Sequence, residues 1–253
     1  MNIAYPIGGF FLGVYIFFKG LIWLKQKRLI ENMPTSKIRS LAMGLVEVFG
    51  EIVPAGKKML NCPFSGKECV YYRYKIEEYR SSGKSGHWVT IKKGEKGIPF
   101  YLKDKTGMVL VNPSGARVEI SNPNLKNRFD SGFGRDPPEL VKKFLASRGL
   151  NFENFFGMNK KMRYTEWFLS LADKLYIMGT AQDNPQVEDA TARHGVEDVM
   201  IGKGSHEKIY YISDRHEKDL LKRLGWKVAG GIFGGILLVI GCLLLIFLNF
   251  NML

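Results

Sequence analysis

The sequence predicts an α+β domain, dominated by strands, that is flanked by two transmembrane α-helices. Three observations support this class. An apolar run lies near each end of the chain, at 3–24 and at 228–248. Between them, short segments rich in Val, Ile, Tyr and Phe alternate with Gly, Pro, Asn and Asp, a pattern typical of strands and turns. Few stretches of residues 41–213 carry helix-start and helix-stop residues.

The first apolar run, 3–24, contains one charged residue, Lys19, and is long enough to cross a bilayer as a helix. We therefore assign residues 1–24 to a first transmembrane helix. A cleaved signal peptide is the competing interpretation. It requires a basic start and a cleavage site of small residues, and Met1–Phe18 contain no cation.

The second apolar run, 228–248, contains no charged residue and predicts a second transmembrane helix. Residues 214–227 before it predict a juxtamembrane helix capped by Ser213, and residues 249–253 form a short tail. The polar residues 25–40 after the first apolar run predict a linker, and because Pro34 interrupts them we expect the membrane helix to end near Asn32. Two buried core helices of a soluble protein are the alternative for both apolar runs.

The central domain, 41–213, predicts several strands and one helix. A strand bent or bulged at Gly44 and Gly50 opens it, and a hairpin turning at 81–86 begins a meander. Pro and Gly bound one helix within 137–149. Residues 121–136 and most of 183–204 have the composition of loops. The expected strands are 41–52, 70–79, 87–93, 99–102, 108–112, 116–120, 173–181 and 207–213.

Cations near the two apolar runs predict the orientation of the chain. They follow the first run and precede the second, whereas the segments outside both runs contain none. Such cations stay on the cytoplasmic side of a membrane. We therefore expect the central domain on the cytoplasmic side of the plasma (cytoplasmic) membrane and both termini on its outer side. The residues that set this topology are Lys25, Lys27, Arg28, Lys222, Arg223 and Lys227.

The net charge of the chain indicates which kinds of partner it attracts. The chain has a net charge of +13, and Lys19 is its only cation outside 25–227. Such a domain is attracted to anionic lipid headgroups. No nucleic-acid-binding motif accompanies the charge, so we do not expect a nucleic-acid partner.

Cys62 and Cys69 are spaced so that they could form a disulfide in an oxidising compartment, but in the cytoplasm we expect reduced thiols that pack in the core.

Five runs in order along the chain resemble one known family. They are PTSKIRSLAMGLVEVFG, NCPFSGKECVYYRYKIEEY, IPFYLKDKTGMVLVNP, YIMGTA and YYISDRHEKDLLKRLGWKVAGGIFG. Together they resemble the GIDE domain, the membrane module of mitochondrial and chloroplast outer-membrane E3 ubiquitin ligases. The resemblance implies two membrane spans around one domain, which matches the pattern above.

The chain departs from those ligases at its carboxyl end. The ligases continue into a RING finger whose Cys and His ligands hold zinc, whereas this sequence has three cysteines and ends five residues after Leu248. The resemblance therefore implies a RING-less, prokaryotic-type member with the anchor but not the transferase activity. We find no Walker A, GxGxxG or GxSxG motif, and we expect no catalytic residue, no metal and no cofactor.

Two sets of residues are candidates for binding. Aromatic residues around an arginine indicate a recognition surface, although a tyrosine-rich strand is more often simply part of a half-buried sheet. Glycines four residues apart in the apolar runs let helices approach closely, within one chain or between chains of a homo-oligomer. The first set is Tyr71, Tyr72, Arg73, Tyr74 and Trp88, and the second is Gly9, Gly13, Gly230, Gly231, Gly234 and Gly235.

These observations leave three functions open. The first is a membrane-anchored interaction or scaffold module that binds a protein or lipid ligand. The second is a transferase subunit, similar to an E3 ubiquitin ligase, that works with a separate catalytic partner. The third is an oligomeric membrane assembly with a stress-related role. The missing catalytic motifs favour the first.

Overall fold

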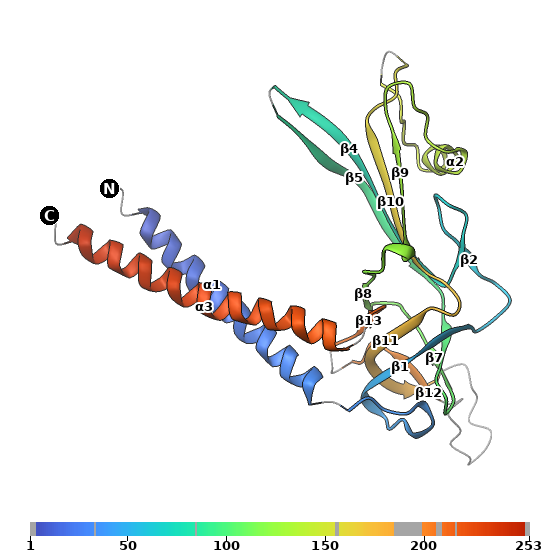
Figure 1. Cartoon of the computed structure of the whole chain (residues 1–253), viewed down its shortest axis with the longest axis horizontal. Helices are drawn as coiled ribbons and strands as arrows, with labels where there is room; N and C mark the ends of the chain where they lie inside the picture. Colours follow the sequence, from blue (N-terminus) through green and yellow to red (C-terminus); the bar gives the residue numbers. More distant parts are fainter. Residues whose placement is uncertain are drawn as a thin grey trace. The chain divides into compact units, whose positions relative to one another are not determined.

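The computed structural model describes residues 4–32, 34–83, 85–154, 157–184, 199–205, 209–215 and 217–250. The chain forms two compact units. One contains the terminal segments Met1–Pro34 and His216–Leu253, and the other contains Thr35–Arg215. The second unit is rich in strands and the first consists of two long helices, so the predicted fold class is confirmed (Figure 1).

Two apolar helices form the first unit. Helix α1 spans Ala4–Glu31 and helix α3 spans Glu217–Phe250, so α3 joins the predicted juxtamembrane and transmembrane segments in one helix. Each contains a 28-residue stretch that is long and apolar enough to cross a bilayer, with mean hydropathies of 1.8 and 2.9. Only 11% and 17% of the residues in their most apolar windows are buried. Apolar side chains that face outward are expected in lipid, which argues against two core helices of a soluble protein.

The second unit contains a seven-stranded sheet. Strand β1 pairs with both β6 and β11, and β7 and β12 complete the circuit between them, so five of the strands close into a small barrel. Apolar side chains from these strands fill its interior, including Val48, Phe100 and Ile177, each of them fully buried. The strands are β1 Gly44–Pro54, β6 Phe100–Lys103, β7 Met108–Val111, β8 Arg117–Glu119, β11 Lys174–Asp183, β12 Val199–Gly202 and β13 Tyr211–Ser213.

A second sheet has four antiparallel strands in the order β5-β4-β10-β9. They are β5 Ser85–Gly97, β4 Tyr71–Ser82, β10 Met162–Leu169 and β9 Lys126–Ser131. Helix α2, Glu139–Ser147, places Val141 and Leu145 in a second core against one face of this sheet. Between β1 and β4 lie the short strands β2 Leu60–Asn61 and β3 Glu68–Cys69, and the 3₁₀ turns η1 Ile38–Ser40 and η2 Pro123–Leu125 complete the unit.

Several local predictions are confirmed. The hairpin predicted from 70 to 93 is β4 paired with β5, with Ser82 opposite Ser85. The helix predicted within 137–149 is α2, and α1 ends beside Asn32, whose N–H donates to the Arg28 carbonyl. Each of these elements depends on residues close together in the sequence.

The predictions that depended on longer-range pairing were wrong. The meander stops after β5, because β6 pairs with β1 and β7 instead. Strand β9 lies within residues 121–136, which were predicted to form a loop. Strand β12 lies in the described part of the second predicted loop, 183–204. Residues 185–198 and 206–208 fall outside the described residues, so the predicted loop and the start of the strand predicted at 207–213 are described only in part.

Two local assignments also need correction. Strand β1 keeps one register with β11 from Gly44 to Glu51, without a bulge at Gly50. The glycine is needed for close packing, because a Cβ at Gly50 would lie 2.5 Å from the Lys103 carbonyl oxygen. Ser213 belongs to β13, and its hydroxyl accepts from the Arg215 N–H at a turn before α3, not from the helix.

Candidate recognition surface

The candidate site is one face of the four-stranded sheet, which we call the open face. Side chains along a strand alternate between the two faces of a sheet, so neighbouring residues of β4 point in opposite directions. On β4 the open face carries Arg73 and Lys75, and the paired strands add Trp167 and Arg128. Arg128 is exposed, and Arg73, Lys75 and Trp167 are partly exposed, so solvent reaches this face.

The opposite face is covered by the second core. Phe64 lies at its centre and contacts the rings of Tyr74, Phe144 and Tyr164 edge-to-face, with centroid distances of 5.8, 5.4 and 5.9 Å. Phe144 belongs to α2, so these contacts attach the helix to the sheet. The second core therefore makes one face structural and leaves the other for contacts.

The five residues of the predicted recognition surface are divided between these faces. Arg73 and Trp88 lie on the open face. Tyr74 is 6% exposed in the second core, and Tyr72 packs against both cores. Tyr71 is buried and donates a hydrogen bond of 2.7 Å to Glu95; its burial, together with that bond, raises the pKa of the phenol. Only Arg73 and Trp88 are therefore placed to contact a partner through this face.

Cations stack on the aromatic rings of the open face. The guanidinium of Arg163 lies 3.9 Å from the centroid of Trp88, and that of Arg73 lies 5.0 Å from Trp167. The ammonium of Lys126 is 5.5 Å from the same Trp167 ring. These distances are in the range of cation–π attraction, which is worth about 0.5–1 kcal/mol at exposed sites. The rings therefore restrict the positions of these cations.

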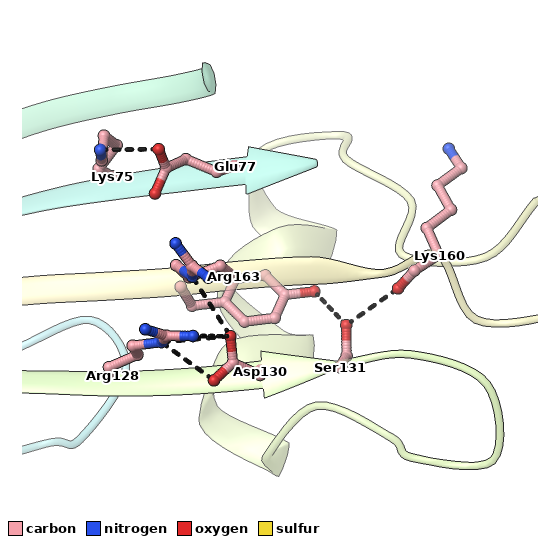
Figure 2. Close-up of polar contacts among 8 residues, drawn as sticks. Lys75, Glu77, Arg128, Asp130, Ser131, Lys160 and Arg163 are labelled. Atoms are coloured by element: carbon pink, nitrogen blue, oxygen red, sulfur yellow. Dashed lines mark hydrogen bonds and ion pairs between the residues drawn. The ribbon is translucent and has the colours of Figure 1, made fainter. Parts of the chain in front are cut away.

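Carboxylates pair with cations on the same face (Figure 2). Lys75 lies 2.7 Å from Glu77, and Arg128 lies 3.1 Å from Asp130. Asp130 is also 3.5 Å from Arg163 on the neighbouring strand, so one carboxylate lies between two guanidinium groups. Partly exposed pairs of this kind add little stability, but they restrict the side chains that carry the charge.

The balance of charge on the open face is positive. Among the described residues, seven cations and three carboxylates lie on it: Arg73, Lys75, Lys93, Lys126, Arg128, Lys161 and Arg163 against Glu77, Glu95 and Asp130. Each carboxylate already contacts a cation or Tyr71. The remaining positive potential suits an anionic ligand.

The sequence did not indicate half of this surface. Trp167, Arg163 and Arg128 come from β9 and β10, which were not assigned as strands. The signal that could have revealed Arg163 and Trp167 is the alternation in RYTEWFL, where Arg163, Thr165 and Trp167 share one face.

A buried carboxylate lies beneath the opposite face. Glu166 is fully buried and accepts hydrogen bonds from the Phe64 N–H at 2.8 Å and from the Asn127 side-chain amide at 2.9 Å. Both carboxylate oxygens are thereby hydrogen-bonded, as a buried charge requires. Because its oxygens are engaged by the protein, Glu166 has a structural role.

No group of three His, Cys, Asp or Glu side chains suited to a metal ion occurs within the described ranges. The expectation of no metal and no cofactor remains untested. Cys62 and Cys69 are buried with their sulfur atoms 3.4 Å apart. Hydrogen bonding to Cys69 and burial raise the pKa of the Cys62 thiol, so this thiol is protonated at neutral pH.

The predicted helix-association glycines fall into two groups. A Cβ at Gly231 would lie 2.7 Å from Gly20 Cα, and one at Gly235 would lie 2.7 Å from the Phe17 backbone nitrogen. Gly13 faces Gly235 and Val239, and Gly9 faces Cys242, so α1 and α3 pack antiparallel within one chain. A Cβ at Gly230 or Gly234 would meet no atom within 4 Å. These two therefore take no part in that contact.

The cations that were predicted to set the topology lie at one end of this helix pair. Lys25, Lys27 and Arg28 lie in the last turns of α1, and Lys222, Arg223 and Lys227 lie in the early turns of α3, which runs the opposite way. Lys27 pairs with Glu31 at 2.7 Å, and a Cβ at Gly225 would lie 3.7 Å from the Lys27 side chain. The end of the pair at which the chain connects to residues 35–215 is thus strongly cationic.

Comparison with known families agrees with this architecture. A family model described as "GIDE: E3 Ubiquitin ligase" matches residues 71–246, from the start of β4 to near the end of α3. No curated protein and no solved structure matches the chain. Because the family model covers more than half of the 253 residues, the chain belongs to the GIDE family.

Proposed function

We propose that this protein is a membrane-anchored interaction module whose open face binds an acidic segment of a partner protein. The observation that carries the proposal is the set of cations held on Trp88, Trp167 and neighbouring carboxylates across β4, β9 and β10. Cations with restricted side chains lose little entropy when carboxylates bind them. Guanidinium groups also bind carboxylates with two hydrogen bonds at once.

The same geometry favours an acidic protein over other anionic ligands. Attraction to anionic lipid does not require fixed cation positions, because mobile headgroups adapt to the protein. Single-stranded nucleic acid needs free aromatic faces for its bases, whereas the Trp88 and Trp167 rings already carry cations. A peptide with spaced carboxylates matches charges that are distributed over several strands.

Binding to a defined acidic peptide tests this function. We expect the full chain, in uncharged detergent, to bind a labelled peptide of alternating Glu and Val more tightly than its Gln counterpart. The double variant Lys126→Ala and Arg128→Ala should lower the affinity about tenfold, since two of the contacting cations are lost. Fluorescence anisotropy at several salt concentrations measures the effect.

The matched control removes the same charge elsewhere. Lys57 and Lys105 are exposed in turns next to strands of the seven-stranded sheet. Replacing both by alanine should leave peptide affinity unchanged. Equal losses in the two double variants would show that only net charge matters, and a preference for anionic nanodiscs over the peptide would favour lipid as the ligand. Either result contradicts the proposal.

We further propose that the helices cross the cytoplasmic membrane with both termini outside. The support is the cationic end of the helix pair next to residues 35–215, because such cations stay in the cytoplasm. Alkaline phosphatase fused after Leu253 should then be active, and a fluorescent protein fused there should be dark. Fusions inserted at Lys105 should behave the opposite way. The reverse pattern at both positions would overturn this orientation.

The family description supports a second candidate, a subunit of an E3 ubiquitin ligase that relies on another chain for catalysis. On this view the open face would recruit the catalytic partner or its substrate. The two candidates differ in which protein is bound. Purified ubiquitin-conjugating enzyme that binds the full chain, and that competes with the acidic peptide, would favour the ligase subunit over a general interaction module.

A further inference from the structure

Two buried thiols face each other in the β2–β3 hairpin, Cys62 just after β2 and Cys69 at the end of β3. The sulfur atoms of Cys62 and Cys69 are 3.4 Å apart, and the residues are 2% and 0% exposed. Backbone hydrogen bonds close the loop around them, from the Cys62 N–H to the Lys67 carbonyl at 2.8 Å and from the Gly66 N–H to the Cys62 carbonyl at 3.0 Å. The two thiols are thus brought together by the hairpin itself.

The pair is close to disulfide geometry. In the short hairpin Leu60 is opposite Cys69, so Cys62 and Cys69 are diagonal neighbours on one face. A disulfide needs sulfur atoms about 2.05 Å apart, so closure requires an approach of about 1.4 Å. Rotation about the side-chain bonds and a small hairpin adjustment can supply this approach. The family match begins at residue 71 and does not include this loop.

The same loop joins the two cores of the domain. Cys62 and Cys69 pack in the core that also contains the barrel residues Val48, Phe100 and Ile177. Phe64, which lies between the two cysteines in the sequence, packs in the second core. The Phe64 N–H also donates to the buried carboxylate of Glu166. If the loop opened, Phe64 would leave the second core and Glu166 would lose a hydrogen-bond donor. The state of the two thiols therefore acts on the covered face of the four-stranded sheet.

We propose that Cys62 and Cys69 are a redox modification site, a dithiol that small-molecule disulfides convert to an intramolecular disulfide that locks this loop in place. One thiol, after losing its proton, attacks the small disulfide and releases one thiolate. The second thiol then attacks the mixed disulfide and releases the other. The two cysteines lose two electrons and two protons, and the small disulfide becomes two thiols.

Burial sets the rate of this exchange. In the closed loop both thiols are buried and the Cys62 thiol is protonated, whereas the attacking species is a thiolate that must reach the oxidant. The reaction therefore proceeds through transient opening of the β2–β3 loop, and its rate should level off at high oxidant concentration. Once formed, the bond restricts a loop whose ends are seven positions apart. This restriction should lower the population of the open loop on the order of fifty-fold.

Oxidised glutathione and the full chain in detergent provide the test. We expect the folded protein to lose two hydrogen atoms in mass and to keep no bound glutathione. Peptide mapping should show the bond between Cys62 and Cys69. Cys242→Ser should behave like the unchanged chain, whereas Cys69→Ser should lose the bond. Hydrogen exchange at the Phe64 amide should slow on the order of fifty-fold on oxidation, while Ile177 in β11 should not change.

Two results would overturn the proposal. One is a folded chain that forms no Cys62–Cys69 bond under conditions in which the urea-unfolded chain forms it. The other is a bond that forms without slowing exchange at Phe64, because the disulfide would then not lock the loop. Neither result depends on the ligand of the open face. The disulfide proposal and the proposed recognition function are therefore tested independently.

Discussion

Replacing Gly231 and Gly235 together by leucine is expected to separate α1 from α3 within the membrane. A Cβ at either position already lies 2.7 Å from backbone atoms of α1, at Gly20 and Phe17, and backbone cannot move aside as a flexible side chain can. Close packing is the main attraction between helices in lipid, so leucine at these positions removes it. Membrane insertion should persist because leucine favours the bilayer core.

An engineered disulfide measures this separation. Gly9→Cys would place its Cβ about 2.6 Å from the Cys242 sulfur, close enough for an oxidant to join the two helices of one chain. We expect the yield of this crosslink to fall about tenfold in the leucine pair, as the packing is lost. Leucines at Gly230 and Gly234, which adjoin no atom within 4 Å, are the matched control and should leave the yield unchanged. A crosslink mainly between chains would contradict packing within one chain.

Phe64→Ala is expected to cause the largest loss of stability in the strand-rich unit, about 3–5 kcal/mol. The ring is 1% exposed and lies among Tyr74, Phe144 and Tyr164, which cannot fill the cavity without moving α2. The edge-to-face contacts are lost as well. Urea unfolding of the full chain in detergent, followed by fluorescence and circular dichroism, measures the change.

Phe133 supplies the control for that substitution. It is 87% exposed in the turn between Gly132 and Arg135, so Phe133→Ala removes the same side chain without opening a cavity. Its effect should stay within about 0.5 kcal/mol. Similar losses for the two variants would mean that Phe64 does not hold the second core together.

Local sequence signals predicted the elements that depend on neighbouring residues. The two apolar helices, the β4–β5 hairpin and α2 each begin and end at residues that favour those boundaries on their own, such as the Pro137–Pro138 pair before α2. The polar strand β9 was missed because it lies at a sheet edge, where Arg128 and Asp130 face solvent and resemble a loop. The barrel pairing of β7 with β12 joins segments far apart in the chain, which composition does not indicate.

The same limits apply to the candidate site. A run of tyrosines and an arginine indicated a surface near residue 73, but the alternation of a strand sends Tyr72 and Tyr74 into the second core. The rest of the open face comes from β9 and β10, so pairing had to be known first. Likewise, spacing alone favoured the four glycines of α3 equally, whereas packing separates Gly231 and Gly235 from the other two.

Site-specific photocrosslinking in native membranes tests the central claim most directly. Thr90 is exposed on β5 opposite Glu77, at the open face. Lys105, which is exposed in the turn between β6 and β7, is the reference position. A photoreactive residue at Thr90 should capture a protein through an acidic segment, and the Lys126→Ala and Arg128→Ala pair should abolish that capture. The same adduct at Lys105, or an adduct at Thr90 that survives the loss of both cations, would contradict recognition by the open face.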